Sequence, residues 1–413
     1  MPASAPRPNR SVLAALPDPS PDFTPLLSER HVALAVSGGS DSTALMHLAK
    51  DWASACHPQL KLSVLTVDHR LRPDSAAEAQ AVGKWAAALG LEHQLLSWGG
   101  PKPQSGLQAK ARAARYNLMS EWCRAHDGSL LLTGHTLDDQ AETVAMRLGR
   151  TGSPESLAGI PRLGEWQGVP LFRPLLACRR VALRDYLSAR GQGWVEDPSN
   201  TDPRFERVRM RQGLVDLDGH GITPGRLARL AEDAARTSAL IDDLATRWTR
   251  RWLAEEEAGI CHLPSEPFLA LPPALQQRIL GRILRHYGGG GFAPEPEELR
   301  RLMRFIEAGP VRCTLAGALI GRRKRGVWIT REAGRIPREP LTVPETGEAL
   351  WDGRFRVTAA PGARVRAAGA ENRDPASLGP DVPVFARRAF PVVEQPPGAP
   401  GEPRIAFVRL APP

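Results

Sequence analysis

The stretch VALAVSGGSDS, from Val32 to Ser42, joins an apolar run to a glycine-containing turn, and the helix-forming run Thr43–Ala49 follows it. This pattern predicts a buried strand that leads through a short turn into a helix N-terminus. Glycines let the backbone approach an anion closely, and the free N–H groups at the helix start point toward it. The serine hydroxyls add donors, while Asp41 can stand at the helix start or reach a metal ion. The turn is therefore predicted to hold a phosphate group.

A capped turn between a core strand and a helix is the alternative interpretation of a bare S-G-G. No lysine follows the glycines, so the turn is not the nucleotide loop written G-x-x-x-x-G-K-[ST]. The complete string S-G-G-x-D-S resembles the pyrophosphate loop (PP-loop) of ATP pyrophosphatases, which form AMP-activated intermediates. This resemblance implies that ATP is cleaved between its α and β phosphates. It also implies that ATP is bound by Ser37, Gly38, Gly39, Ser40, Asp41 and Ser42.

The first half of the chain alternates strand and helix signals. This alternation predicts an α/β fold, a parallel twisted sheet with helices on both faces, similar to the adenine nucleotide α-hydrolase-like PP-loop fold. Ligands of such sheets bind beyond the carboxyl ends of the strands, where the Ser37–Ser42 turn falls. The expected strands are Val32–Val36, Leu62–Val67, His93–Ser97 and Ser129–Thr133, and the expected helices are Ser42–Ala55, Ser75–Leu89 and Gly106–Ala125.

The character of the sequence changes after about residue 203, where long amphipathic patterns replace the alternation. Helices are expected at Pro224–Leu253, Pro272–Tyr287 and Pro294–Ile306, and strands at Val311–Leu319, Gly326–Thr330 and Arg354–Val357, with a basic turn at Arg322–Arg325. Four parts follow. Residues 1–28 are expected to be disordered or loosely ordered, 29–215 to form the catalytic PP-loop domain, 216–310 a helical region, and 311–413 a small mixed α+β C-terminal domain.

Composition narrows the class of protein. At 413 residues the chain is long enough for two or three domains. No apolar run approaches a membrane span, and Met1–Asn9 lacks the apolar core of a secretory signal, so a cytoplasmic protein without a membrane partner is expected. The five cysteines are far apart and form no C-x-x-C pair, which argues against disulfides, zinc and iron–sulfur sites. A net charge of +9, mostly from arginine, weakly favours a polyanionic partner.

Two further segments offer candidate nucleotide contacts. The second strand runs into VDHRLR, from Val67 to Arg72, which puts His69 and Arg72 beside the predicted phosphate turn. Within the next helix, Arg112 and Arg115 are three residues apart, so they share one face and can clamp a phosphate. A solvated loop and an exposed helix face are the alternatives for these two segments.

A fourth segment, GHTLDDQAET, begins at Gly134 after the strand Ser129–Thr133. His135 stands at the strand end, and acidic residues gather around the next helix N-terminus. They are Asp138, Asp139 and Glu142. Carboxylates at this place can hold magnesium, attract an amine or interact favourably with the helix dipole. A helix cap explains one of these acids well, but it explains the whole group less well.

Taken in order, SGGSDS, VDHRLR, ARxxRY, GHTLDDQAET, RPLL (173–176) and EDPSN (196–200) resemble the tRNA(Ile)-lysidine synthetase family over roughly residues 30–215. The similarity returns faintly at 314–317, 328–332 and 351–355. The segment Gly134-His135-Thr136 departs from many relatives, which carry two adjacent histidines there, so no role is carried over to Thr136. The His135 and Asp139 positions match.

The resemblance implies a ligase that joins free L-lysine to the wobble cytidine of a CAU anticodon in tRNA(Ile). The cytidine is first adenylated, and the products are lysidine, AMP and pyrophosphate. ATP and Mg²⁺ are the implied cofactors. The implied catalytic residues are Asp41, Arg112, Arg115, His135 and Asp139, with His69 near the nucleotide and Asp41 and Asp139 near the metal.

The helical region and the C-terminal domain are expected to bind tRNA through phosphates and shape. The candidates are Arg204, Arg207, Arg209, Arg211 and the basic turn Arg322–Arg325. The sequence does not specify an oligomeric state, and a homodimer stays open. A PP-loop tRNA thiolase is the nearest alternative function, although the missing C-x-x-C pair disfavours it. A GMP-synthetase-like amidotransferase would need a glutaminase for which the chain has no room upstream. A non-catalytic RNA-binding protein is disfavoured by Asp41, His135 and Asp139.

Overall fold

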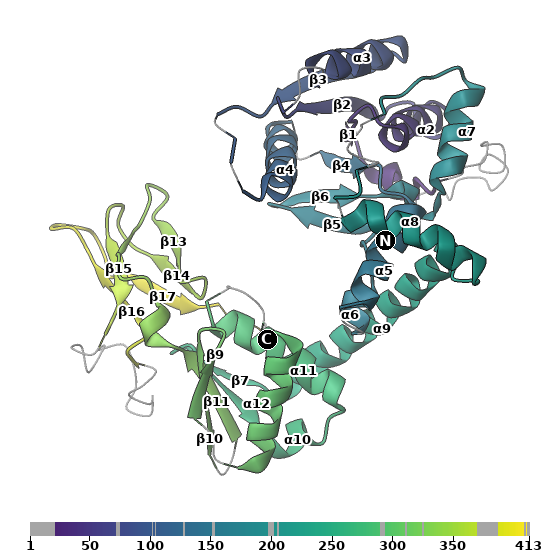
Figure 1. The fold of residues 1–413 in the computed structure, drawn as a ribbon. Helices are drawn as coiled ribbons and strands as arrows, with labels where there is room; N and C mark the ends of the chain where they lie inside the picture. The colour runs from purple at the N-terminus through teal and green to yellow at the C-terminus, as the bar shows by residue number, and fades with distance from the viewer. Residues whose placement is uncertain are drawn as a thin grey trace, which may run out of the picture. The chain divides into compact units, whose positions relative to one another are not determined.

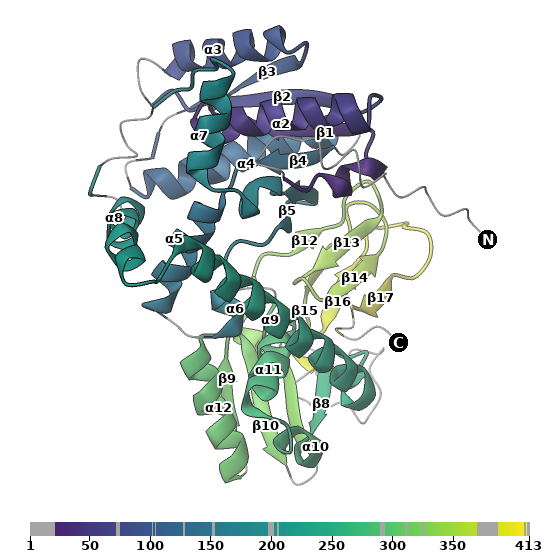
Figure 2. The same cartoon turned by 90° about the vertical axis from the view of Figure 1, so that its right-hand side faces the viewer.

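A computed structural model describes residues 21–71, 75–100, 102–103, 105–126, 129–150, 153–196, 202–204, 206–289, 294–309, 312–323, 326–369, 387–408 and 410. The chain divides into two compact units, residues 1–238 and 239–413. Figures 1 and 2 show the ribbon from two directions. The long helix α9 (Pro224–Trp252) begins in the first unit and ends in the second. None of the described helices combines the length and the apolar content that a membrane span requires.

The first unit is built on a six-stranded sheet with the order β3-β2-β1-β4-β6-β5. Neighbouring strands from β3 through β6 pair in parallel, and β5 adds an antiparallel edge. The strands are β1 (His31–Ala35), β2 (Lys61–Asp68), β3 (Glu92–Ser97), β4 (Leu130–Thr133), β5 (Leu163–Trp166) and β6 (Val169–Phe172). The expected strands all form, while the β5–β6 hairpin was not foreseen.

Helices cover both faces of this sheet, as the sequence predicts. Because side chains alternate along a strand, Val32 and Leu34 of β1 face one layer, and Ala33 faces the other. The Val32 side packs against α2 (Ser40–Cys56), α3 (Ser75–Ala88) and α7 (Arg180–Ala189), and the Ala33 side packs against α4 (Leu107–Ala125). The two layers lie on opposite sides of the sheet in Figure 1. The fold class is therefore confirmed.

Further helices follow the last parallel strands. They are α5 (Leu137–Leu148), α6 (Pro154–Leu157) and α8 (Glu206–Gly219), with 3-10 turns η1 (Thr24–Ser28) and η2 (Pro174–Ala177). A small apolar cluster joins α5, α8 and the start of α9 through Val144, Leu214 and Leu227. This cluster fixes α8 beside α5, which brings basic residues of α8 toward the carboxyl ends of the strands.

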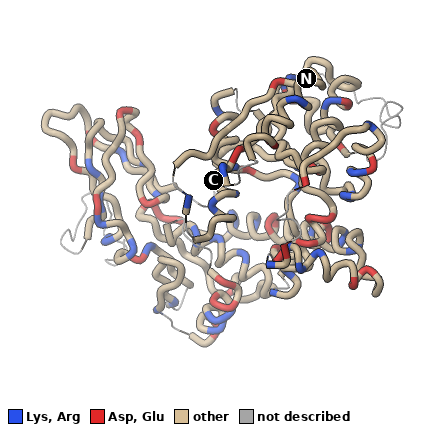
Figure 3. The backbone as a smooth tube through the Cα atoms, turned by 45° about the horizontal axis from the view of Figure 1, so that its top comes forward, with Lys and Arg blue, Asp and Glu red and all other residues tan. Residues whose placement is uncertain are grey.

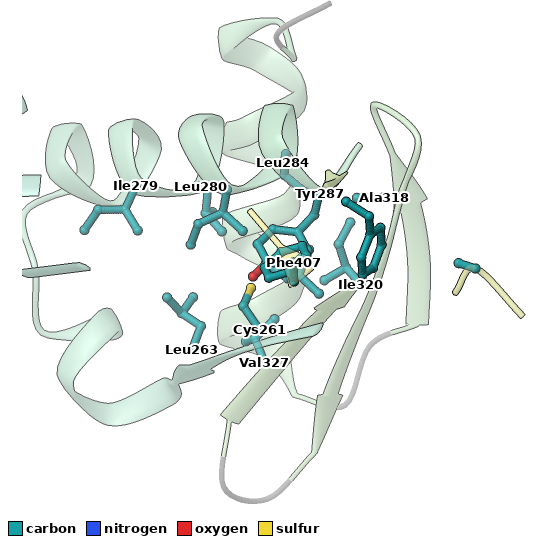
Figure 4. Packing of buried hydrophobic residues seen from close by; sticks show 14 of the residues in the cluster. Cys261, Leu263, Ile279, Leu280, Leu284, Tyr287, Ala318, Ile320, Val327 and Phe407 are labelled. Carbon is teal, nitrogen blue, oxygen red and sulfur yellow. The ribbon is translucent and has the colours of Figure 1, made fainter. Parts of the chain in front are cut away.

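The second unit contains a five-stranded antiparallel sheet with the order β7-β8-β11-β10-β9. Figure 4 shows side chains of α11, such as Leu280 and Leu284, pointing toward Cys261 and Val327 of the sheet. The strands are β7 (Ala254–Glu256), β8 (Ile260–Pro264), β9 (Arg312–Leu315), β10 (Ala318–Arg323) and β11 (Gly326–Arg331), and the helices are α10 (Ser265–Leu269), α11 (Pro273–Tyr287) and α12 (Pro296–Ala308).

Two three-stranded sheets complete this unit, β12-β15-β16 and β13-β14-β17. A buried ion cluster joins the end of β11 to the turn between β13 and β14, where Asp352 bridges Arg331 and Arg354. The side chain of Asp352 is 4% exposed, that of Arg331 7% and that of Arg354 1%. The two arginines also donate to backbone oxygens, among them Gly288 O and Ala389 O. The strands are β12 (Leu341–Thr342), β13 (Glu348–Trp351), β14 (Phe355–Thr358), β15 (Arg364–Ala367), β16 (Pro391–Glu394) and β17 (Arg404–Phe407).

Several local predictions differ from the structure. The expected strand Val311–Leu319 is a hairpin, because Ala316 and Gly317 both take positive φ (48° and 77°) and turn the chain between β9 and β10. The region 216–310 is not wholly helical, since it includes β7 and β8. Within the expected loose N-terminus, residues 1–20 lie outside the described residues, whereas Phe23 and Leu26 are buried in the core because they pack beneath α2.

Within the described part of the chain, the positive charge does not collect in one place. Lysine and arginine positions are interspersed with aspartate and glutamate along both units (Figure 3). One arginine of the basic turn, Arg322, donates to the carbonyl oxygens of Ile306, Glu307 and Gly309 at the end of α12. It therefore caps a helix C-terminus, and its expected tRNA contact stays a prediction.

Candidate active site

The Ser37–Ser42 turn links β1 to α2 at the carboxyl end of the central strand. Hydroxyl groups close the turn, because Ser42 Oγ accepts from Ser37 N at 3.1 Å and donates to Gly39 O at 3.1 Å. Gly38 has a φ of +88°, and a Cβ there would stand 3.1 Å from a methyl carbon of Val195, so the position favours glycine. The backbone is thus shaped so that the N-terminus of a 17-residue helix faces outward from the sheet edge.

The strand β2 ends beside this turn and supplies His69. Its Nε2 atom accepts from Nε and Nη2 of Arg115, both at 3.1 Å. Burial, with the nearby charges of Arg115 and Lys102, lowers the pKa of His69 to about 4, so the ring is neutral. Lys102 Nζ lies 3.9 Å from the ring centre of Trp98, whose edge meets His69. His69 thus holds Arg115 in place, and Arg72 lies outside the described residues.

Helix α4 presents both predicted arginines to one hollow. Arg112 lies over the ring of Tyr116, with 5.1 Å between guanidinium carbon and ring centre, and Tyr116 in turn stacks on Trp166. Arg115 is held by His69 as described above. The two guanidinium groups therefore have different supports, one aromatic and one a hydrogen-bond acceptor.

The end of β4 and the start of α5 contribute His135 and Asp139. Thr136 is the helix N-cap and forms a capping box, because Asp139 N donates to Thr136 Oγ1 and Asp139 Oδ2 accepts from Thr136 N at 2.8 Å. His135 Nδ1 lies 2.9 Å from Thr133 Oγ1. Burial lowers the pKa of His135 to about 4, against the opposing charge of Asp139. Thr136, to which the resemblance carried over no role, thus serves here as a helix cap.

Arg180, at the start of α7, joins the two predicted metal ligands. Its Nε donates to Asp41 Oδ2 at 2.9 Å and its Nη2 to Asp139 Oδ1 at 3.0 Å. Burial raises the pKa of Asp41 in spite of Arg180. Burial would raise the pKa of Asp139 too, but the charge of Arg180 and the bonds from Thr136 outweigh it and lower that pKa. Asp41 and Asp139 therefore face one shared position.

Glu142, one turn further along α5, is the most enclosed acid of the group. It is 1% exposed, and its Oε1 accepts from Arg211 Nε of α8 at 2.7 Å. Arg180 Nη1 lies 3.6 Å from the same oxygen. The other oxygen, Oε2, is buried and has no hydrogen-bond partner within the described part of the chain. Such an atom needs a donor from elsewhere, because a buried unsatisfied acceptor is costly.

These side chains surround a cavity of about 610 Å³ in the first unit, a size usual for a small-molecule site. Of the predicted residues, the lining includes Ser37, Gly39, Ser40, Asp41, Ser42, Arg112, Arg115, His135 and Asp139. The other two predicted residues are not among the described lining residues. Gly38 lies next to Val195 and Val82, and His69 contributes through its hydrogen bonds with Arg115. The predicted turn at Asp197–Asn200 lies outside the described residues.

Sequence reasoning missed Arg180 and Arg184, which also line the cavity. Arg184 Nη2 lies 3.2 Å from Glu196, and its Nε lies 3.4 Å from Ser40 Oγ. The sequence does contain one indication of their role. Arg179 and Arg180 stand at the start of a helix, where positive charge is unfavourable. A cation at that position needs a partner outside its own helix.

Comparisons with known proteins give matches over most of the chain. A model of the PP-loop domain matches residues 11–217. The chain is 40% identical over 328 residues to a tRNA(Ile)-lysidine synthase of Ruegeria pomeroyi, covering 79% of this chain and 76% of that one. It is 42% identical over 304 residues to a tRNA(Ile)-lysidine synthase of Methylobacterium nodulans, covering 70% and 86%.

Among solved structures, a U34-tRNA thiolase NcsA from Methanococcus maripaludis with its [4Fe-4S] cluster aligns with a TM-score of 0.44 and 19% identity. The alignment covers 55% of this chain and 77% of that one. At this level the likeness carries no argument about chemistry.

Proposed function

Since the chain belongs to the tRNA(Ile)-lysidine synthase family, and is thus an ATP-using ligase that modifies tRNA, we propose that its cavity joins free L-lysine to the wobble cytidine of a CAU anticodon in tRNA(Ile). The reaction has two steps. The 2-carbonyl oxygen of cytosine attacks the α phosphate of ATP and pyrophosphate leaves. The ε-amine of lysine then attacks C2, and AMP leaves with the former carbonyl oxygen.

The first step needs a place for a triphosphate, and the Ser37–Ser42 turn supplies it. The N-terminus of α2 offers N–H donors there, and Arg112 and Arg115 face the same cavity from α4. Charge on the departing pyrophosphate grows during this step, so arginines aimed at it lower the barrier. Arg115 is held by His69 and Arg112 lies over Tyr116, so either guanidinium can serve in that role.

The donor set fits Mg²⁺ bound together with ATP. Mg²⁺ is usually held by one or two carboxylates plus substrate phosphates. Asp41 and Asp139 supply such a pair, and no larger metal-binding group of His, Cys, Asp or Glu occurs among the residues that the structure describes. When bound, the ion would neutralise phosphate charge.

The second step needs an acidic place for the ε-ammonium group of lysine, which must lose a proton before it attacks. Glu142 supports this part of the proposal, because its Oε2 atom is buried at the cavity wall and has no donor among the residues that the structure describes. Asp139 lies on the same helix face, one turn away. His135 stands at the same edge, but burial lowers its pKa to about 4, so its neutral ring is a weak base and the carboxylates are the better place for the ammonium group.

The tRNA contacts and a homodimer stay proposals as well. Arg207 and Arg211 of α8 line the cavity, which suits an approach of the anticodon loop from that side. A thiolase would need reactive cysteines near the nucleotide, and none of the five cysteines is among the described residues that line the cavity. The single observation that carries the proposal is that the phosphate turn, which includes Asp41, lines one cavity together with Asp139 and Glu142.

The direct test is incorporation of labelled lysine into tRNA(Ile) bearing CAU, with ATP and Mg²⁺. Elongator and initiator tRNA(Met), which also carry CAU, are the specificity controls. Asp41→Ala should abolish incorporation and leave tRNA binding nearly intact, whereas Asp243→Ala, on an exposed helix position, should behave as the unmodified protein. No incorporation by the unmodified protein, beside a working relative, would refute the proposal. Sulfur transfer to the tRNA would favour the thiolase.

A further inference from the structure

Arg180 lies between the two carboxylates that the proposed function assigns to Mg²⁺. Its guanidinium spans Asp41 Oδ2 and Asp139 Oδ1 at 2.9 and 3.0 Å, and its side chain is 18% exposed. Asp139 has no second oxygen to offer, because Oδ2 already accepts from both the backbone N–H and the hydroxyl of Thr136. A cation at Asp139 must therefore use the oxygen that Arg180 holds.

The helix that carries Arg180 is anchored independently of this contact. Tyr186 Oη donates to Asp51 Oδ2 at 2.8 Å, and Arg190 Nη2 lies 2.9 Å from the same oxygen. Leu183 and Leu187 are fully buried in the apolar cluster that α7 shares with α2. The helix therefore does not depend on the Arg180 ion pairs for its place, and the long side chain can change partners while the backbone stays.

The charges around Arg180 explain why its side chain lies between the carboxylates and why a cation can displace it. Asp41, Asp139 and Glu142 carry three negative charges around it, and Arg180 and Arg211 return two positive ones. An arginine at the first position of a helix is repelled by the helix dipole, so these carboxylates hold it in place. A bound cation would take over two of the three carboxylates and repel the guanidinium.

We propose that Arg180 is a displaceable counter-ion: it keeps Asp41 and Asp139 together until a divalent cation takes its place, and it then contacts the phosphates of ATP. The cavity makes this second position accessible, because Arg180 and the Ser37–Ser42 turn line the same hollow. Arg180 is thus a positioning residue for the metal site. The inference rests on the proposed use of Mg²⁺ and ATP.

Removing the Arg180 guanidinium should change the affinities for Mn²⁺ and for ATP in opposite directions. Arg180→Gln should bind Mn²⁺ alone about tenfold more tightly, since one positive charge beside the ion is removed. The same variant should bind ATP with Mg²⁺ several-fold more weakly, since a phosphate contact is lost. Mn²⁺ binding is followed by the electron paramagnetic resonance of free ion, and ATP binding by calorimetry. A merely structural arginine would weaken both or neither.

Three controls sharpen the experiment. Arg179→Gln removes the adjacent arginine, which pairs with Asp138, and should leave Mn²⁺ affinity unchanged. Adding Asp41→Asn to Arg180→Gln should cancel the gain, which ties the gain to this site. Arg180→Lys keeps the charge but lacks the planar fork through which Nε and Nη2 reach the two carboxylates, so it should shift both affinities in the same directions by less. It also serves if the glutamine variant does not fold.

Unchanged or weaker Mn²⁺ binding by both Arg180 variants would overturn the proposal, and so would unchanged ATP binding. Neither measurement uses tRNA or lysine. A failure here would therefore leave the lysine-incorporation result untouched, and a failure of that assay would leave the metal measurements interpretable.

Discussion

Replacing Asp352 by asparagine should destabilise the second unit far more than its size suggests. Asp352 accepts from Arg331 Nε at 3.0 Å and from Arg354 Nε at 3.0 Å, and the three side chains are at most 7% exposed. Asparagine keeps the shape and tolerates the positive φ of 49° at this position, so the change isolates the charge. Burial lowers the pKa of Arg354 to about 10 although Asp352 opposes it, so loss of Asp352 leaves two poorly compensated cations.

The expected cost is about 3–5 kcal/mol, the usual range when one partner of a buried ion pair is removed. Hydrogen exchange in β11 and β14 of the full-length protein measures it, because these strands carry the two arginines or flank them. Asp243→Asn is the matched control, since its pair with Arg247 is 75% and 50% exposed and is worth only about 0.3–0.5 kcal/mol. If the two variants lose the same protection, the ion cluster does not hold the unit together.

The remaining predictions concern the first unit. Gly134→Ala would put a Cβ 3.1 Å from backbone atoms of Asp41 and Ser42, so it should cost about 1–3 kcal/mol in thermal unfolding and weaken ATP binding. Gly149→Ala, whose Cβ would meet only one atom at 3.9 Å, should do neither. Burial first, then nearby cations, lowers the pKa of His69 to about 4, so the protein should lose stability as pH falls from about 6.5 to 4. The His69→Gln variant should lose less stability over that pH interval. Equal losses of stability in the two proteins would contradict the lowered pKa of His69.

Local chemistry made the first half of the fold predictable. The strand, turn and helix around Ser37–Ser42 follow from an apolar run, two glycines and a helix-forming run, and each signal acts over a few residues. The hairpin at Ala316–Gly317 escaped the same approach, because an alanine at positive φ gives no warning in a sequence.

The site was predictable where its residues belong to short segments, and not where distant segments meet. Asp41 and Asp139 follow strands whose carboxyl ends lie side by side, so parallel topology brings them together. Arg180 lies 139 residues beyond Asp41, and only packing of α7 on α2 brings the two into contact. Glu142 was recognised as an acid near the site, but its unpartnered oxygen is a property of the folded chain alone.

The two carboxylate oxygens of Asp139 have separate roles, because Oδ2 belongs to the helix cap and Oδ1 faces the cavity. A substitution at this position therefore disturbs the start of α5 and the charge of the site at the same time. A natural substitution at residue 139 would affect both roles. If it preserved only one of them, it would persist only together with a second substitution elsewhere. Thr136 is the place for such a compensating change, because its hydroxyl and N–H are the cap partners of Asp139. The two positions are expected to evolve as a pair.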